Sequence, residues 1–156
     1  MTTLLALDIG GTKVGWGIVE AGDTYEVTER GSIPTDAMRG GADVAARICE
    51  LASSLVASHP AVSGVAVASA GVVDPSTGDI ASATGTMPGW GGTPLGSLLQ
   101  EATGLTVRVL NDVHAHGLGE ATLGAGQPYR SVLSIAVGTG IGGALVEDRQ
   151  VSFGSR

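Results

Sequence analysis

The sequence predicts an α/β fold with a mixed sheet that opens with three antiparallel strands and is flanked by helices. Its 156 residues are 43% hydrophobic and only 15% charged, so a compact core can form and disorder is not expected. Apolar residues alternate with small ones near the start, and short turns interrupt them, as in strands joined by hairpins. After residue 41, helical periods alternate with short apolar runs, which indicates strands joined through helices.

The opening unit is expected to contain strands at Thr3–Ile9, Val14–Glu20 and Tyr25–Ile33, with turns at Gly10–Lys13 and Ala21–Asp23. Three consecutive strands connected by short turns form an antiparallel unit. This start differs from the plain βα alternation of a doubly wound sheet.

The middle of the chain predicts a helix, a strand and a long loop. Apolar residues recur at spacings of three and four over Gly41–Ser58, and His59-Pro60 should end that helix. The run Val62–Ser69 is short and apolar enough for a central parallel strand. Residues Ala70–Gly92 hold most of the turn dipeptides and predict a functional loop.

The remaining elements follow the same reasoning. In order, they are a helix at Thr93–Thr103 with Pro94 in its first turn, a strand at Leu105–Leu110, a helix at Val113–Leu123, a strand at Ser131–Val137 and a hairpin at Ala144–Ser152 that turns at Asp148-Arg149. Asn111 or Asp112 can cap the helix at Val113–Leu123.

Charge and composition exclude several classes of function. Eight Lys and Arg against fifteen Asp and Glu give a net charge of −7, which argues against a nucleic-acid partner. Aromatic residues are only 3%, so stacking platforms for single strands are not expected. The single cysteine, Cys49, excludes an internal disulfide. Asp8 interrupts the first apolar run and no run is long enough to span a bilayer, so we expect a soluble, cytoplasmic protein without a membrane partner.

Glycine is unusually frequent, with 26 residues, and it gathers where apolar runs end. Such positions allow a positive φ or the close approach of a ligand, which favours a small, phosphorylated molecule. The segment Gly138–Gly143 matches G-x-G-x-x-G literally. A strand-like run follows it, where a dinucleotide site would need a helix. We interpret it as a hairpin turn whose N–H groups face a phosphate; an ordinary hairpin turn is the alternative.

The same reasoning applies to the turn after the first strand, where Asp8 stands beside Gly10, Gly11 and Thr12. A carboxylate next to a phosphate is repulsive unless a cation lies between them, so Asp8 implies Mg²⁺. Here too an ordinary hairpin turn is the alternative.

Asn111 and Asp112 lie between a strand and a helix. They can act as a helix cap, or Asp112 can accept a proton from a hydroxyl that attacks a phosphoryl group. His114 and His116 do not share a helix face, so a paired metal site is not expected. In the segment Met87–Trp90, Trp90 either packs within the loop or holds the loop against the body.

Five ordered segments carry a resemblance to the ROK family (repressors, open reading frames and sugar kinases) of the sugar kinase/Hsp70/actin superfamily. They are LALDIGGTKVGWGIV, AGVVDPSTGDI, MPGW, VLNDVHAHGLGEATLGAG and SIAVGTGIGGALVEDRQV. The resemblance implies a ribonuclease H-like, actin-like ATPase fold. It also implies ATP-dependent phosphorylation of a glucose-like hexose, with a sugar and a nucleotide as partners and a homo-oligomer as a possible assembly.

Residue roles follow from matching positions. The resemblance implies that Asp112 is the general base, and that Gly71, Thr86 and Asn111 contact the sugar together with it. For ATP it implies a first phosphate loop of Gly10, Gly11, Thr12 and Lys13, a second of Gly138, Thr139 and Gly140, and Asp8 orienting Mg²⁺ through water. Lys13 matches the lysine of the family motif, and its surrounding sequence assigns it no specific chemical role.

This chain departs from the family pattern in several places. Thr86 stands where many family kinases have Asn, and Ala70 and Val72 replace prolines around Gly71. The resemblance implies a sugar-kinase lobe at residues 1–125 and the opening hairpin of an ATP-binding lobe at residues 126–156. The family's E-x-G-H motif and zinc site are expected only downstream of Arg156.

Two other functions remain open at this point. One is the lobe of a sugar-responsive transcriptional regulator, which the early position of Asp8 makes less favoured because no helix-turn-helix domain precedes it. The other is an inactive sugar-binding fragment.

Overall fold

The structure is a computed structural model that describes residues 1–137 and 141–154. By their contacts these residues form two units, Met1–Leu110 and Asn111–Arg156. Each unit is described by itself.

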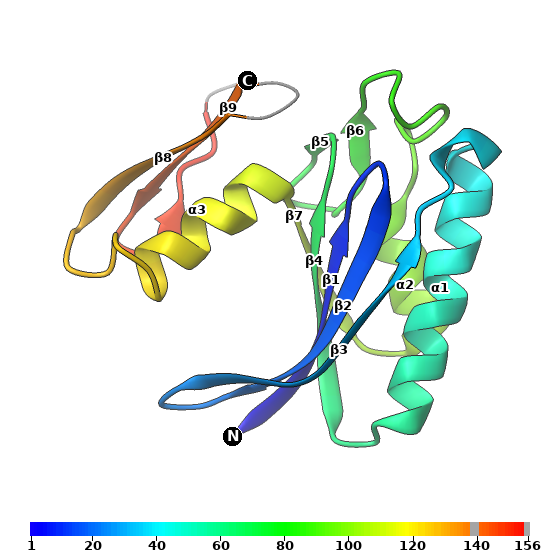
Figure 1. The fold of residues 1–156 in the computed structure, drawn as a ribbon, viewed down its shortest axis with the longest axis horizontal. Coiled ribbons are helices and arrows are strands. Elements are labelled where there is room, and N and C mark those ends of the chain that lie inside the picture. The colour runs from blue at the N-terminus through cyan, green and yellow to red at the C-terminus, as the bar shows by residue number, and fades with distance from the viewer. Residues whose placement is uncertain (138–140, 155–156) are drawn as a thin grey trace. The chain divides into compact units, whose positions relative to one another are not determined.

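The first unit is built on a five-stranded sheet (Figure 1). Its strands are β1 (Thr2–Ile9), β2 (Lys13–Ala21), β3 (Tyr25–Pro34), β4 (Val62–Ser69) and β7 (Thr106–Asn111), in the order β3-β2-β1-β4-β7. β2 pairs antiparallel with both β1 and β3, whereas β1 and β4 are parallel. The predicted mixed sheet with three antiparallel opening strands is therefore confirmed.

Two helices, α1 (Gly41–Ser58) and α2 (Leu95–Thr103), lie on one face of this sheet (Figure 1), and a 3-10 turn at Ala37–Arg39 precedes α1. The sheet presents alternate residues to them, so Leu5, Leu7 and Ile9 of β1 are buried in the core. α1 has the predicted bounds because its apolar stripe packs on that core. α2 begins two residues later than predicted, after the helix N-cap Pro94.

The predicted long loop at residues 70–92 contains a small sheet. β5 (Val72–Val73) pairs antiparallel with β6 (Ile80–Ser82). Strands of two and three residues are too short to produce a period in the sequence, so the prediction missed them. This sheet pairs two short strands in the first half of the segment, and the rest of the segment has no helix or strand.

The second unit contains α3 (Asp112–Thr122) and the strands β8 (Ser131–Val137), β9 (Ile141–Glu147) and β10 (Gln150–Val151) in the order β10-β9-β8. A glycine brings α3 close to the hairpin: a Cβ on Gly117 would lie 2.7 Å from the Cβ of Ala144. The turn predicted at Asp148-Arg149 is confirmed, with φ values of 49° and 61°.

One prediction for this unit was wrong. Ile141, Gly142 and Gly143 belong to β9 rather than to a turn, so the strand begins three residues before the predicted Ala144. Gly142 is needed for packing, because a Cβ there would lie 2.9 Å from Cγ2 of Val113. The other face of the hairpin exposes the aliphatic side chains of Leu133, Ile135, Val137 and Ile141.

The division by contacts places α3 with the hairpin, whereas the sequence assigned it to a lobe at residues 1–125. That lobe boundary stays a prediction. Within the described residues, none of the helices combines the length and the apolar character that crossing a membrane requires.

Candidate functional site

The turn between β1 and β2 is where the sequence predicted a phosphate loop. Asp8 is exposed near the end of β1, and its register partners are Gly15 on β2 and Ala68 on β4. The N–H of Gly10 donates to the carbonyl of Lys13 at 3.1 Å, so this amide closes the turn instead of facing a ligand. Gly11 and Thr12 are exposed. These two residues form the accessible part of the turn.

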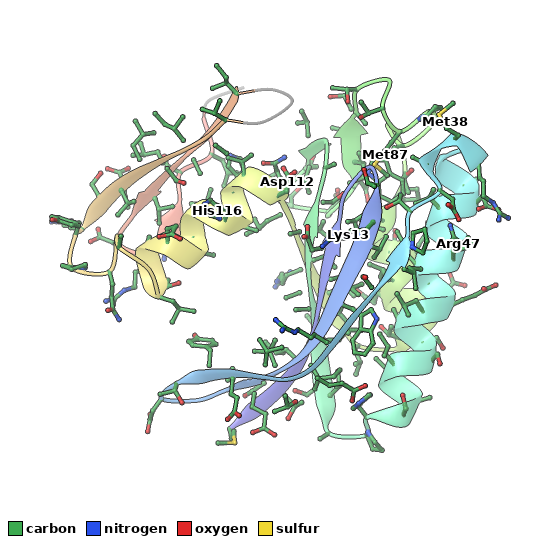
Figure 2. All side chains as sticks on the ribbon, viewed as in Figure 1. Lys13, Met38, Arg47, Met87, Asp112 and His116 are labelled. Carbon is green, nitrogen blue, oxygen red and sulfur yellow. The ribbon has the colours of Figure 1, made fainter. Side chains whose placement is uncertain are left out.

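A buried threonine holds the turn in place. Thr35 is only 1% exposed; its hydroxyl donates to the carbonyl of Gly10 at 2.6 Å and its N–H to the carbonyl of Thr12 at 3.0 Å. Arg47 extends from α1 (Figure 2) and donates to the carbonyls of Thr35 and Pro34 at 2.9 and 3.0 Å. The position of the turn therefore depends on contacts from distant parts of the chain.

The segment after β4 begins next to the same turn. The N–H of Ala70 donates to the carbonyl of Ile9 at 2.9 Å. Gly71 has a φ of +99°, and a Cβ added to it would lie 2.8 Å from the carbonyl oxygen of Ser82. Only glycine fits this conformation and this space without strain.

The segment around Met87 also approaches the β1–β2 turn. A Cβ on Gly11 would lie 3.9 Å from Cγ of Met87, which is buried (Figure 2). The neighbouring Thr86 is exposed, and its hydroxyl lies 2.8 Å from that of Thr84. The first unit thus brings the β1–β2 turn, Gly71 and the Thr86 segment to one end of the sheet, as the carboxyl ends of parallel strands predict.

Trp90 fixes this segment to the body. Its side chain is fully buried, and Nε1 donates to Oγ of Ser69 at 3.3 Å and to the carbonyl of Ala70 at 3.2 Å. Of the two interpretations of Trp90, the structure supports the one in which it holds the loop against the body. The residues it contacts directly precede Gly71.

In the second unit, Asp112 is the first residue of α3 and is exposed. Asn111 is the N-cap: its side-chain oxygen accepts from the N–H groups of Val113 and His114 at 3.0 and 3.3 Å. Oδ1 of Asp112 accepts from Nδ2 of Asn111 and from the N–H of Val113, both at 2.9 Å. The helix start therefore orients the carboxylate through its nearest neighbours.

The second predicted phosphate loop, Gly138, Thr139 and Gly140, lies outside the described residues. Nearby, Val113 at the start of α3 packs on Gly142 of β9. His114 makes an edge-to-face contact with Phe153 at 5.4 Å between ring centroids, and His116 is exposed.

Comparison with known proteins decides the family. A family model described as the ROK family matches residues 4–156. The chain belongs to the ROK family. A glucokinase from Halalkalibacterium halodurans is 30% identical to it over 96% of this chain and 46% of its own length. The chain spans about half the length of the curated relatives it matches.

Solved ROK structures share the fold. The ROK hexokinase from Thermus thermophilus is 31% identical and superposes with a TM-score of 0.84, covering 99% of this chain and 50% of that chain. A ROK glucokinase from Streptomyces griseus, in complex with glucose and AMPPNP, is 28% identical with a TM-score of 0.83, covering 98% and 47%. The actin-like ATPase fold predicted for this ROK chain is confirmed.

A ROK transcriptional regulator, a homologue of the E. coli MLC protein, also matches, with a TM-score of 0.84 at 24% identity over 96% of this chain and 38% of its own. At that identity the match supports the shared fold alone. The fold therefore does not discriminate between the kinases and the regulators of the ROK family.

One carboxylate of this ROK chain fits a magnesium ion that is shared with substrate phosphates. In residues 1–137 and 141–154, no three His, Cys, Asp or Glu side chains gather closely enough to hold a metal. Asp8 offers one exposed carboxylate at the glycine turn. Mg²⁺ keeps several of its waters and is commonly held by one or two carboxylates together with substrate phosphates. The donor set is consistent with the predicted role of Asp8.

Sequence reasoning missed two positioning residues, Thr35 and Arg47. Neither belongs to a motif, and a threonine after a strand has no sequence signal of its own. The one local signal is the Pro34-Thr35-Asp36 turn at the end of β3, which gives no indication that the hydroxyl reaches Gly10, 25 positions away.

Proposed function

We propose that this chain is the part of a ROK sugar kinase that carries its general base, and that the enzyme transfers the γ-phosphoryl group of ATP to a hydroxyl of a glucose-like hexose. The relatives named glucokinase and hexokinase support the reaction class. The observation that carries the proposal is the exposed, oriented carboxylate of Asp112 at the end of a sheet strand.

The geometry of Asp112 suits proton abstraction. Its Oδ1 is engaged by two donors, and among residues 1–137 and 141–154 Oδ2 accepts no hydrogen bond. We assign Oδ2 to take the proton of the sugar hydroxyl. The oxygen of that hydroxyl attacks the γ-phosphorus at the same time. The new O–P bond forms while the bond from the γ-phosphorus to the bridging oxygen breaks, and ADP leaves.

Three further residues are proposed to contact the sugar. Gly71 and Thr86 belong to the two segments that meet beside the β1–β2 turn. Asn111 is assigned a second task besides the sugar contact, because its amide both caps α3 and holds Oδ1 of Asp112. This double engagement makes Asn111 a positioning residue for the base.

The nucleotide phosphates are assigned to the β1–β2 turn and to Gly138, Thr139 and Gly140. Gly11 and Thr12 are accessible, Gly10 shapes the turn, and the exposed Lys13 supplies a positive charge. Asp8 is proposed to orient the waters of Mg²⁺. Bound there, the ion neutralises charge on the phosphates.

The experiment compares phosphorylation of a hexose panel by the wild type and by Asp112→Asn, in the protein that contains these residues. ATP-Mg²⁺ and inorganic polyphosphate are the donors. General-base catalysis contributes roughly 10²- to 10⁴-fold, so we expect kcat to fall by that factor. Asp23→Asn, the same change on an exposed turn of the first unit, should leave kcat unchanged. Equal kcat for wild type and Asp112→Asn contradicts the assignment.

The inactive sugar-binding fragment is retained as a second candidate because the chain spans about half the length of its relatives. It predicts that glucose binds by calorimetry while no sugar phosphate forms. Phosphorylation that depends on Asp112 excludes it. Absence of both glucose binding and turnover contradicts both candidates.

A further inference from the structure

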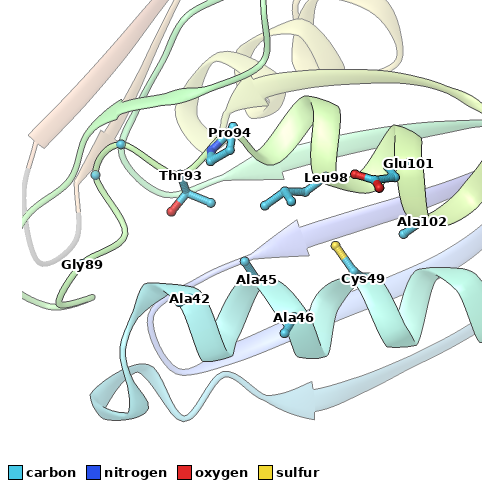
Figure 3. A pocket seen from close by; sticks show the side chains of 12 residues that line it. Ala42, Ala45, Ala46, Cys49, Gly89, Thr93, Pro94, Leu98, Glu101 and Ala102 are labelled. Atoms are coloured by element: carbon cyan, nitrogen blue, oxygen red, sulfur yellow. The ribbon is translucent and has the colours of Figure 1, made fainter.

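The helix face of the first unit contains a cavity of about 690 Å³ between α1 and α2 (Figure 3). This volume falls in the range of small-molecule sites. Most of its wall is apolar, and most of its lining side chains are short. They include Ala42, Ala45 and Ala46 from α1, and Leu98 and Ala102 from α2. The cavity exists because these side chains do not fill the space between the helices.

The third wall of the cavity is the segment Gly89–Pro94, and backbone contacts fix it. The N–H of Gly41 donates to the carbonyl of Pro88 at 2.8 Å, and a Cβ on Gly41 would collide with the carbonyl of Gly89. On the other side, the N–H of Ile80 donates to the carbonyl of Thr93 at 2.9 Å. The cavity is therefore preformed, which lowers the cost of ordering a ligand in it.

The hydroxyl of a largely buried threonine faces this space. Thr93 is only 8% exposed, and within the described part of the chain its side chain makes no hydrogen bond. Figure 3 shows the hydroxyl directed from the wall toward α1. The hydroxyl is open to the cavity, so a polar group of a ligand can hydrogen-bond to it and be oriented by it.

The far end of the cavity carries a negative charge. Glu101 of α2 lines it, as does Cys49 of α1, and no lysine or arginine does. Burial, and then the charge of Glu101, raise the pKa of the Cys49 thiol, so the thiol stays neutral and the carboxylate is the charged group of the wall. Between Leu95 and Glu101 the helix rises about 9 Å, which separates the hydroxyl end from the carboxylate end.

We propose that this cavity binds a small amphiphilic amine: an apolar body against the alanines, a hydrogen-bonding group at Thr93 and a protonated amine at Glu101. The site shares no residue with the proposed phosphoryl-transfer machinery. Its test therefore succeeds or fails independently of the kinase proposal.

Tyramine is a suitable probe because a phenol hydroxyl and an amine stand at the two ends of an aromatic body. Calorimetry should detect tyramine binding, and 3-(4-hydroxyphenyl)propionate, the matched anion, should not bind. Cys49 is the single cysteine, so its alkylation by iodoacetamide can be followed by intact mass. Tyramine should slow that alkylation, because the thiol lines the same cavity.

Variants separate a site from unspecific adsorption. Ala46→Leu fills the cavity from an exposed position of α1 and should abolish binding, whereas Ala57→Leu, on the same helix outside the cavity, should not. Glu101→Gln should weaken tyramine about tenfold and leave 4-methylphenol unchanged. Thr93→Val should weaken tyramine and leave phenethylamine unchanged. Thermal unfolding of each variant checks that it folds.

Two results overturn the proposal. One is the absence of tyramine binding to the wild type up to about 10 mM, a range that covers even weak complexes. The other is equal tyramine affinity for the wild type, Ala46→Leu and Glu101→Gln. Equal binding of the amine and the anion contradicts the assigned role of Glu101.

Discussion

The two candidate carboxylates, one in each unit, are supported in opposite ways. Asp8 lies beside a turn whose carbonyls accept from Thr35, which is 25 positions from Gly10. Asp112 accepts from Asn111 and Val113, its neighbours in sequence. The support of the β1–β2 turn requires the packed sheet and helix. These two hydrogen bonds to Asp112 come from residues at the start of α3 itself. Substitutions around the turn should therefore reduce stability, and those at the start of α3 should mainly affect chemistry.

The largest stability effect is expected for Gly71→Ala, in the region around the β1–β2 turn, which depends on packing. The new Cβ meets the carbonyl of Ser82 in a conformation with a φ of +99°. We expect a loss of about 2–4 kcal/mol in the free energy of unfolding, measured by urea titration. Gly85→Ala is the control, because its added Cβ has no neighbour within 4 Å. Equal losses for both variants contradict the close approach.

Thr35→Val tests the distant support of the turn directly. It keeps the side-chain shape and leaves the carbonyl of Gly10 without its hydroxyl donor. The expected loss is about 1–3 kcal/mol, by the same titration. Thr28→Val also removes a hydroxyl bond to a carbonyl, of Ile18 at 3.3 Å, but on an exposed stretch of β3, and should lose less than about 0.5 kcal/mol. If Thr28→Val loses as much, burial of Thr35 is not the cause.

Asn111→Ala tests the local arrangement. Loss of the N-cap should lower stability by about 1 kcal/mol, while the loss of the bond to Oδ1 of Asp112 should lower kcat. Asn111→Ser retains a capping oxygen and removes the amide donor, so its stability should recover while its kcat stays low. Recovery of both quantities indicates that Asn111 serves as a cap alone.

The smallest effect is expected at the surface contact between α1 and β3. The hydrogen bond to Glu29 raises the pKa of His59, and the carbonyl of Leu55 adds to this. The imidazolium can donate to both acceptors, whereas the neutral ring can donate to one. The stabilisation is therefore complete below the unfolded pKa of about 6.5 and is lost as the pH rises through the higher folded value.

Glu29→Gln checks this linkage. The difference in stability between wild type and variant should be largest near pH 5 to 6 and should shrink toward about pH 8.5. Glu26→Gln, on an exposed neighbouring position of β3, should show no such trend. A difference that stays constant with pH contradicts the role of His59.

Long periodic segments were predictable from the sequence, because burial of one face produces the period. The bounds of Gly41–Ser58, Val62–Ser69 and Ser131–Val137 agree with the structure. Gly142 misled the prediction, because a glycine that permits close packing on Val113 has the same sequence signal as a glycine in a turn. Close approach between segments is a tertiary property that local pattern does not contain.

For the candidate site, the sequence singles out Asp112 and the structure shows where it lies. A carboxylate directly after a strand is recognisable in the sequence, and the structure leaves Asp112 exposed; its role as the base stays a prediction. The support that Thr35 and Arg47 give to the β1–β2 turn was not predictable, since it depends on which segments the fold brings together. A motif indicates candidate reacting groups more readily than the residues that hold their segment in place.

The burial of Trp90 gives the molecule an optical reporter of its own. The chain has two tryptophans, and the indole of this one reaches Ser69 and Ala70 immediately before Gly71. In a Trp16→Phe background its emission would come from that spot alone. A sugar that rearranges the Gly71 segment would then change the colour or brightness of the light, so occupancy could be followed in real time without a label.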